Sequence, residues 1–239
     1  MNILDAIKTR RSIRGYKPDP VPKEIIGEIL EAAVQAPSAV NNQPWEFFVV
    51  TGEPLSNIRH EVIEQFRAGE SPHSEYSLIS WERGSAYWKR QAELGKHIFQ
   101  IMGISREDKE KRAQWMERGL RHFEAPVAMY ICVDKQLSES GPLLDVGAVI
   151  QTICLAAMHC GLGTCVQDQG VMYPEIVRKY ADIPESKRLV IAISIGFPDG
   201  DNIANRITST REPVENITRW IGFDPKPSHD VEEVRERGL

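Results

Sequence analysis

The chain has 239 residues, a formal net charge of −5 and 41% hydrophobic residues, so it is long enough to bury a core without disulfides or metals. The acidic balance argues against a general nucleic-acid binder, which needs a basic excess for phosphate contacts. The four cysteines match no CxxC or zinc-finger spacing and the N-terminus does not resemble a signal peptide, so we expect a reducing, cytoplasmic location.

The N-terminal region combines a short helix with a basic segment. Ile3, Ala6 and Ile7 have helical spacing, which predicts a helix through Thr9. The following residues are basic without any acid, namely Lys8, Arg10, Arg11, Arg14 and Lys17. Like charges repel unless they are solvated or meet an anion. Two interpretations stay open: a solvated turn, or a phosphate site in which Arg10 and Arg14 bind bidentately and Ser12 adds a donor.

Residues 22–51 predict a helix, a loop and a strand. Apolar residues recur with helical spacing from Pro22 to Ala36, the loop runs from Pro37 to Trp45, and the strand EFFVVT follows. Loops at the end of a strand often hold ligands. Ser38, Asn41 and Gln43 either brace this loop or present polar groups to a heterocycle.

The middle of the chain predicts a lid, at about residues 67–120. Residues 54–66 predict a helix, whereas Arg67 to Gly95 is polar and lacks a clean period, as expected of a lid. Its aromatic residues Trp81, Tyr87 and Trp88 either close over a substrate or pack the insertion down. A charged helix from Arg106 to His122 and a buried strand from Pro126 to Val133 follow.

The most apolar stretch runs from Leu143 to Gly163 and predicts a buried helix. Asp145 lies in its first turn and Gly161 can take the left-handed closing position. Its marginal length and Asp145 argue against a membrane span. Small residues recur every fourth position, at Ala148, Thr152, Ala156 and Cys160. Such a stripe allows another helix to approach closely, within one subunit or from a second one.

The C-terminal part completes an alternation of strands and helices. A short strand and turn at TCVQDQG, a helix from Tyr173 to Tyr180 and a strand from Arg188 to Gly196 follow the central helix. The pattern predicts a single three-layer α/β or α+β sandwich. From about residue 205 to 239 the chain is polar, with Trp220, Ile221 and Phe223 as isolated apolar residues. We expect an arm that docks on its own subunit or is exchanged between subunits.

No motif supplies catalytic chemistry from side chains alone. The glycines of Gly161 to Gly163 follow a helix and lack the third glycine of a dinucleotide fingerprint. P-loop, G-x-S-x-G and H-E-x-x-H motifs are absent. A metal site from Cys154, His159, Cys160 and Cys165 is the less favoured alternative, because buried cysteine usually behaves as a small hydrophobe. If the chain is an enzyme, a cofactor supplies the chemistry.

Three separated motifs together resemble the nitroreductase family of flavin enzymes: RRSIRGY at 10–16, PSAVNNQPW at 37–45 and GLGTCVQ at 161–167, with TREPVENI near the end. The resemblance spans nearly the whole chain. It implies an α+β sandwich that forms an intertwined homodimer and binds FMN at the interface.

The resemblance also implies the cofactor-binding residues. Arg10, Arg11, Ser12, Arg14 and Arg211 correspond to residues that hold the phosphate and ribityl chain. Pro37, Ser38, Asn41 and Gln43 belong to a loop that reaches the flavin from the other subunit. The turn of Val166, Gln167, Asp168 and Gln169 directs backbone N–H groups to the reactive N5 edge, so no side chain is expected to be catalytic.

The implied function is an NADH- or NADPH-dependent oxidoreductase that reduces nitroaromatic or quinone-type acceptors by a ping-pong mechanism, with Trp81, Tyr87 and Trp88 in the substrate lid. The protein contributes orientation and electrostatics. Flavin-dependent reductive dehalogenation and oxidation of the flavin itself are alternatives within the family. A flavin-binding protein without turnover is the alternative of another class.

Overall fold

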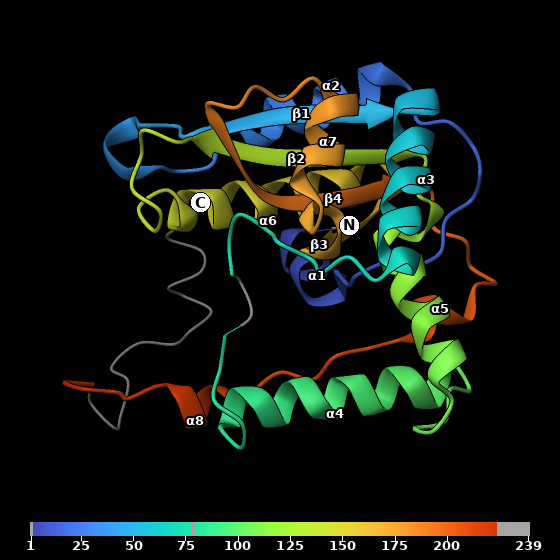
Figure 1. The fold of residues 1–239 in the computed structure, drawn as a ribbon. Helices are drawn as coiled ribbons and strands as arrows, with labels where there is room; N and C mark the ends of the chain where they lie inside the picture. Colours follow the sequence, from blue (N-terminus) through green and yellow to red (C-terminus); the bar gives the residue numbers. More distant parts are fainter. Residues whose placement is uncertain (1, 78–79, 224–239) are drawn as a thin grey trace. The chain divides into compact units, whose positions relative to one another are not determined.

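The computed structural model describes residues 2–77 and 80–223. The chain divides into two units, Met1–Ile207 and Thr208–Leu239, and each is described by itself. The first unit (Figure 1) contains these elements in chain order: α1 (Ile3–Thr9), α2 (Lys23–Ala33), η1 (Ala39–Asn41), β1 (Trp45–Thr51), α3 (Gly52–Ala68), α4 (Ala86–Ile101), α5 (Lys109–Leu120), η2 (His122–Glu124), β2 (Val127–Asp134), α6 (Leu143–His159), β3 (Gly163–Gln167), η3 (Gln169–Val171), α7 (Pro174–Ala181), β4 (Lys187–Gly196) and η4 (Ile203–Arg206).

The described strands form a four-stranded sheet in the order β1-β2-β4-β3, and every neighbouring pair is antiparallel. β2 and β4 lie in the centre and are buried along almost their whole length. Their near-continuous apolar sequences fit this position, because helices cover both faces of the sheet. β1 and β3 form the two edges, which places the segments before them on opposite sides of the sheet.

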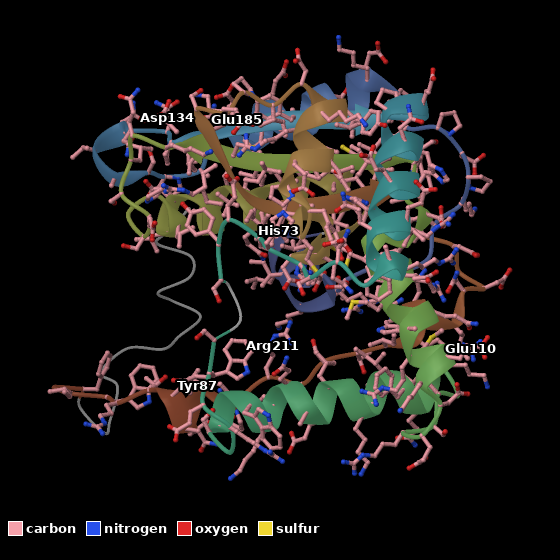
Figure 2. All side chains as sticks on the ribbon, in the orientation of Figure 1. His73, Tyr87, Glu110, Asp134, Glu185 and Arg211 are labelled. Atoms are coloured by element: carbon pink, nitrogen blue, oxygen red, sulfur yellow. The ribbon has the colours of Figure 1, made fainter. Side chains whose placement is uncertain are left out.

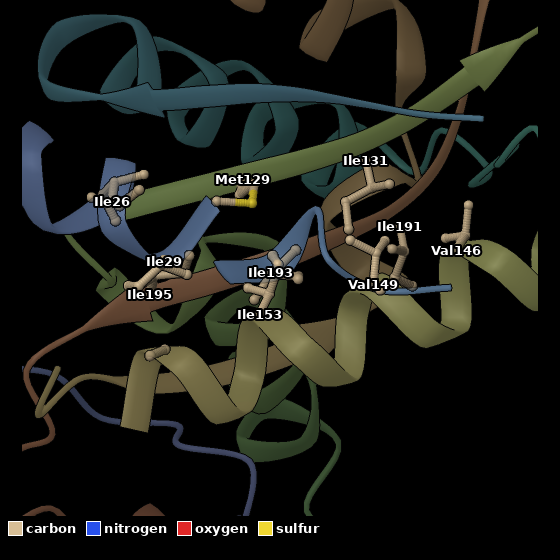
Figure 3. Close-up of a cluster of buried hydrophobic side chains, with 14 of the residues drawn as sticks. Ile26, Ile29, Met129, Ile131, Val146, Val149, Ile153, Ile191, Ile193 and Ile195 are labelled. Carbon is tan, nitrogen blue, oxygen red and sulfur yellow. The ribbon is translucent and has the colours of Figure 1, made fainter. Parts of the chain in front are cut away.

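Alternate residues of the central strands face two helical layers. Met129, Ile131, Ile191 and Ile193 pack with residues of α2 and α6, as Figure 3 shows. Residues between them, such as Tyr130, pack with α3 and α7 on the other face. A strand places successive side chains on opposite faces, so two apolar layers arise from one continuous apolar sequence. The predicted three-layer α+β sandwich is therefore confirmed for the single chain.

The central helix α6 matches the predicted position but is buried on one face only. Val146, Val149 and Ile153 are covered by the sheet and α2 (Figure 3), whereas the Leu144 side chain is 82% exposed. Gly161 ends the helical region with a φ of 76°, as predicted for a closing glycine. One chain does not supply the all-round cover that the apolar sequence requires. The homodimer stays a prediction.

The stretch from Arg67 to Gly95, which lacks a clean period in the sequence, contains the start of a helix. α4 begins within this stretch at Ala86, and the Ser85 side chain accepts a hydrogen bond from the Trp88 backbone N–H at 3.2 Å. None of the α4 residues is buried, so the helix lies at the surface of the first unit. Capping by serine favours this start. His73 lies on the segment before α4, and Tyr87 lies in its first turn (Figure 2).

The second unit is described over 208–223 and contains the short helix α8 (Val214–Ile217). Trp220 and Phe223 pack edge to face, with ring centroids 5.2 Å apart. Both side chains are more than half exposed, so the described part of this unit has no core of its own. The predicted arm therefore remains a segment without an established docking surface. Within the described residues of the whole chain, every helix is too short or too polar to cross a membrane.

Candidate cofactor site

The basic segment runs along the outer edge of β3. The Ile13 N–H donates to the Thr164 carbonyl at 2.9 Å, and Ser12 forms a parallel bridge with Thr164. The Lys17 N–H donates to the Phe197 carbonyl at 2.9 Å. The segment is thus an extended strand-like piece of chain rather than a solvated turn. Its conformation is fixed by backbone hydrogen bonds, so its side chains have defined directions.

Two buried polar side chains, those of Asn205 and Tyr16, form hydrogen bonds with the backbone of this segment. The Asn205 Oδ1 accepts the Arg14 N–H at 2.7 Å, and its Nδ2 donates to the Gly15 and Asp199 carbonyls, both at 2.8 Å. The Tyr16 hydroxyl donates to the Ile13 carbonyl at 2.8 Å. Burial raises the pKa of this hydroxyl well above its ordinary value, so Tyr16 remains a neutral donor. Buried groups satisfied in this way define one backbone geometry.

Alternate side chains of the segment face different surroundings. Burial raises the pKa of the Cys165 thiol, and Arg14, Ser12 and Arg10 act against this rise. Because the segment is extended, Arg10, Ser12 and Arg14 point to one side of it and Arg11 and Ile13 to the other. Arg11 instead lines an open hollow of about 210 Å³ on the other side of the segment. The structure therefore groups Arg10, Ser12 and Arg14 and separates Arg11 from them.

The Val166 to Gln169 turn follows directly on β3 and is held by its own side chains. The Gln167 Nε2 donates to the Ser194 Oγ at 3.0 Å. The Gln169 Nε2 points to the Met116 Sδ of α5 at 2.9 Å. The half-buried Asp168 side chain has no hydrogen-bond or ion-pair partner among the described residues. The turn thus lies at the end of the same strand that carries the basic segment.

The Pro37 to Gln43 loop is braced internally and fixed to α6. The Ser38 Oγ accepts the Gln43 N–H at 3.0 Å, and the Ala39 N–H donates to the Asp145 Oδ1 at 3.1 Å. Asn41 and Gln43 have positive φ angles of 59° and 47°. Asn41 and Gln43 are also exposed, as is Pro37. The loop is therefore a rigid, exposed projection, in agreement with the bracing interpretation and without excluding a ligand.

The basic segment and this loop lie at opposite ends of α6. Asp145, which holds the loop, is in the first turn of the helix, whereas Met158 near its end lines the hollow beside the segment. At 1.5 Å per residue these positions are about 20 Å apart along the helix axis. Figure 1 shows the corresponding separation of β1, which follows the loop, from β3 across the sheet. One chain does not bring the two predicted halves of the site together.

The remaining predicted residues lie outside this group. Arg211 belongs to the second unit, where its Nη1 donates to the Ser209 Oγ at 2.7 Å. Trp81 donates from its indole N–H to the Gln91 Oε1 at 2.9 Å. Tyr87 is 64% exposed and Trp88 is half-buried. The lid aromatics therefore lie on or next to the first turn of α4, with surface available for another molecule.

The cysteine alternative finds no support in the described residues. No group of three or more His, Cys, Asp or Glu residues there has the geometry to hold a metal ion. Burial raises the pKa of Cys154 as well as that of Cys165. Both thiols are therefore protonated at neutral pH and pack as small apolar groups.

The sequence reasoning missed the residues that support the site. Asn205 and Arg118 contact the Arg14 backbone, the latter through a donor bond from its Nη2 to the Arg14 carbonyl at 3.0 Å. Asn205 is 191 positions from Arg14 along the chain, and no local pattern links them. Tyr16 lies within the RRSIRGY motif, but its role is visible only in the structure, where its buried hydroxyl donates to the Ile13 carbonyl.

Comparisons with known proteins identify one family. The model of the "Nitroreductase family" matches residues 7–197. The chain is 31% identical over 220 residues to the chloronitrobenzene nitroreductase of Comamonas testosteroni and 32% identical over 220 residues to the nitrobenzene nitroreductase of Ectopseudomonas oleovorans. Each alignment covers 92% of this chain and 96% of the relative.

Two solved structures are also similar over nearly the whole chain. An FMN- and NADPH-dependent nitroreductase from Sphigopyxis sp. strain HMH matches with a TM-score of 0.89 and 28% identity, covering 93% of this chain and 100% of that structure. An FMN-dependent nitroreductase from Mycobacterium smegmatis, in complex with NADPH, matches with a TM-score of 0.85 and 25% identity, covering 92% and 100%.

Proposed function

The chain belongs to the nitroreductase family, and from this premise we propose that it is an FMN-dependent NAD(P)H oxidoreductase that reduces nitroaromatic or quinone-type acceptors. The observation that carries the proposal is the grouping of Arg10, Ser12 and Arg14 beside β3, next to the turn that ends this strand. The names of the relatives support a nitroaromatic acceptor.

The donor set fits the phosphate end of FMN. Arg10 and Arg14 offer forked guanidinium donors, Ser12 offers a hydroxyl, and the segment that carries them is already extended and fixed. Guanidinium groups bind phosphate bidentately, and each charge-assisted hydrogen bond contributes about 1.5–3 kcal/mol. The family resemblance implies Arg211 as a further phosphate-binding guanidinium. A dianionic phosphate offsets the repulsion among these like charges.

The remaining part of the cofactor would lie along the Val166 to Gln169 turn. FMN supplies hydride transfer when it is bound, which no side chain of this chain can perform. The chain contributes a rigid turn whose backbone N–H groups can bind the ring edge, and buried neighbours that exclude water. Because Gln167 and Gln169 use their side chains to hold the turn, its contribution to binding comes from the backbone.

A homodimer would complete the site. The Pro37 to Gln43 loop is about 20 Å from the basic segment of its own chain along α6, so it can reach a shared cofactor only from a second subunit. Apolar side chains are exposed on α6, at Leu144, and on α1, at Ile3 and Leu4. A dimer interface would cover them. The proposed dimer is therefore obligate.

The acceptor and the nicotinamide would use the same exposed face of the cofactor in turn. This arrangement gives ping-pong kinetics, with parallel double-reciprocal plots at several acceptor concentrations. Trp81, Tyr87 and Trp88 lie on or beside α4 with exposed aromatic surface, which can cover a flat substrate. Intersecting plots would show a ternary complex and contradict the shared site.

The test is the visible absorbance spectrum of the purified protein before and after addition of NADPH without oxygen, followed by turnover with nitrobenzene and with a quinone. We expect a flavin spectrum that bleaches with NADPH and returns when an acceptor is added. NADH in a parallel measurement identifies the preferred nicotinamide. A flavin spectrum that does not respond to either nicotinamide would indicate a binding protein without turnover and would contradict the proposal.

A further inference from the structure

Gly119 lies in the last turn of α5, where a glycine requires an explanation. It is buried and has no side chain, and a glycine in a helix costs up to about 1 kcal/mol relative to alanine. A Cβ at this position would overlap the amide group of Gln169. The glycine therefore makes room for a side chain that comes from another element, the turn after β3.

Gln169 fills this space with its whole side-chain amide. Its Nε2 also donates to the Met116 Sδ, one helical turn before Gly119, at 2.9 Å. Residues three apart lie on the same face of a helix, so Met116 and Gly119 form one receptor for the amide. The Gln169 side chain therefore packs against α5 and does not extend from the turn into solvent.

The neighbouring residue of the turn is equally confined. A Cβ at Gly170 would overlap the Ala192 side chain and come within 2.9 Å of the His122 Nε2. The backbone of the turn therefore rests directly on β4 and on the His122 ring, while Gln169 ties it to α5. The turn cannot move toward the sheet without displacing the Ala192 or His122 side chain.

We propose that Gly119 and Gln169 act as a positioning pair, which keeps the Gln169 side chain out of the cofactor site and holds the turn with its backbone N–H groups facing the flavin. The inference rests on the proposed function, because it concerns the turn that we place at the ring edge. It adds a role for α5, part of the predicted lid, in cofactor binding.

A double-mutant cycle on the full-length protein tests the pair. Gly119→Ala, Gln169→Ala and the double variant are compared by FMN dissociation constant, from quenching of flavin fluorescence, and by melting temperature without FMN. Gly27→Ala is the matched control, because Gly27 lies in α2 and a Cβ there would meet no atom within 4 Å. The control should leave FMN affinity unchanged and should not lower the melting temperature.

Gly119→Ala should weaken FMN binding about tenfold, within the range for coupled neighbours, because the displaced amide enters the cofactor site. Gln169→Ala should weaken FMN binding less than Gly119→Ala does, because it loses the tie to α5 but leaves no displaced amide in the cofactor site. The double variant should match Gln169→Ala. A double variant that stays as weak as Gly119→Ala would overturn the inference. So would coupling in melting temperature without coupling in FMN affinity, since the pair would then only stabilise the fold.

The two proposals fail differently. A wild-type protein that binds no FMN contradicts the proposed function and the inference with it. A wild-type protein that binds FMN, together with a Gly119→Ala variant that behaves as Gly27→Ala does, contradicts the inference alone.

Discussion

The Asn205 side chain accepts the backbone N–H of Arg14 at 2.7 Å and donates to the carbonyl of the next residue, Gly15, at 2.8 Å. A residue close to the end of the first unit therefore fixes the backbone of the basic segment near its start. Arg14 can present its guanidinium in one direction because its main chain is held on both sides.

Asn205→Ala should weaken FMN binding and lower the free energy of unfolding by about 2–4 kcal/mol, because it removes three hydrogen bonds of a buried side chain and leaves their backbone partners unpaired. Urea unfolding and FMN titration measure the two effects. Asn57→Ala, on α3, is the control and should change neither quantity appreciably. An unchanged FMN dissociation constant in Asn205→Ala would mean that the segment does not hold the cofactor.

Arg10→Ala and Arg14→Ala should each weaken FMN binding by at least about tenfold, because each removes a charge-assisted contact with the phosphate. Arg211→Ala should have a similar effect. Arg11→Ala is the most informative comparison, because its side chain lies on the other side of the segment; its effect should be clearly smaller. Equal losses for Arg11 and Arg10 would show general attraction by the basic cluster instead of a defined phosphate site.

Truncation of Trp81, Tyr87 or Trp88 to alanine should raise KM for the acceptor and leave the rate of flavin reduction by NADPH nearly unchanged, if the lid encloses the aromatic substrate. Anaerobic stopped-flow measurements separate the two half-reactions. Ile104→Ala, a half-buried residue after α4, controls for loosening of the lid. Equal slowing of both half-reactions would show that the aromatic residues contribute to nicotinamide binding or to the stability of the fold instead.

His122 should remain neutral down to low pH. Burial, with a smaller contribution from Arg59, lowers its pKa to about 3. The unfolded chain binds the proton more readily, so the contribution of this group to stability is lost as the pH falls from about 6.5 towards 3. NMR titration of the ring protons should show no change for His122 between pH 8 and 5.

His73 provides the internal comparison, because its backbone bond to Ser71 and its ion pair with Glu175 raise its pKa. Its contribution has the opposite sign: it is present below pH 6.5 and is lost as the pH rises through the raised pKa. A normal titration of both residues would contradict the buried and paired environments.

Arg178→Ala should destabilise the fold by about 3–5 kcal/mol, because it removes the guanidinium that pairs with Glu75 and donates to two backbone carbonyls. The Arg178 Nη2 donates to the Glu75 Oε2 at 2.6 Å, and only 8% of the Arg178 side chain is exposed. Lys179→Ala removes the neighbouring but exposed ion pair with Glu61 and should destabilise the fold far less, because water screens an exposed pair. Comparable losses in urea unfolding would contradict this difference in burial.

The sequence by itself determined most helices and strands, because apolar spacing with a period of 2 or 3.6 records which side chains face the core. The continuous apolar runs at 126–133 and 188–196 predicted buried strands, and these are β2 and β4 at the centre of the sheet. The start of α4 at Ala86 was not identified, because the polar, irregular residues before it and the absence of a buried face gave no boundary signal beyond Ser85.

The three short motifs also predicted the chemistry of the site. Arginine and serine side chains such as Arg10, Ser12 and Arg14 have hydrogen-bond donors in any fold. Only the tertiary structure decided how those donors are arranged. It grouped Arg10, Ser12 and Arg14 and turned Arg11 away, because an extended segment alternates its side chains. It also paired Asn205 with Arg14 and Gln169 with Gly119. These contacts join residues distant in the chain, and their energies depend on packing that no local pattern records.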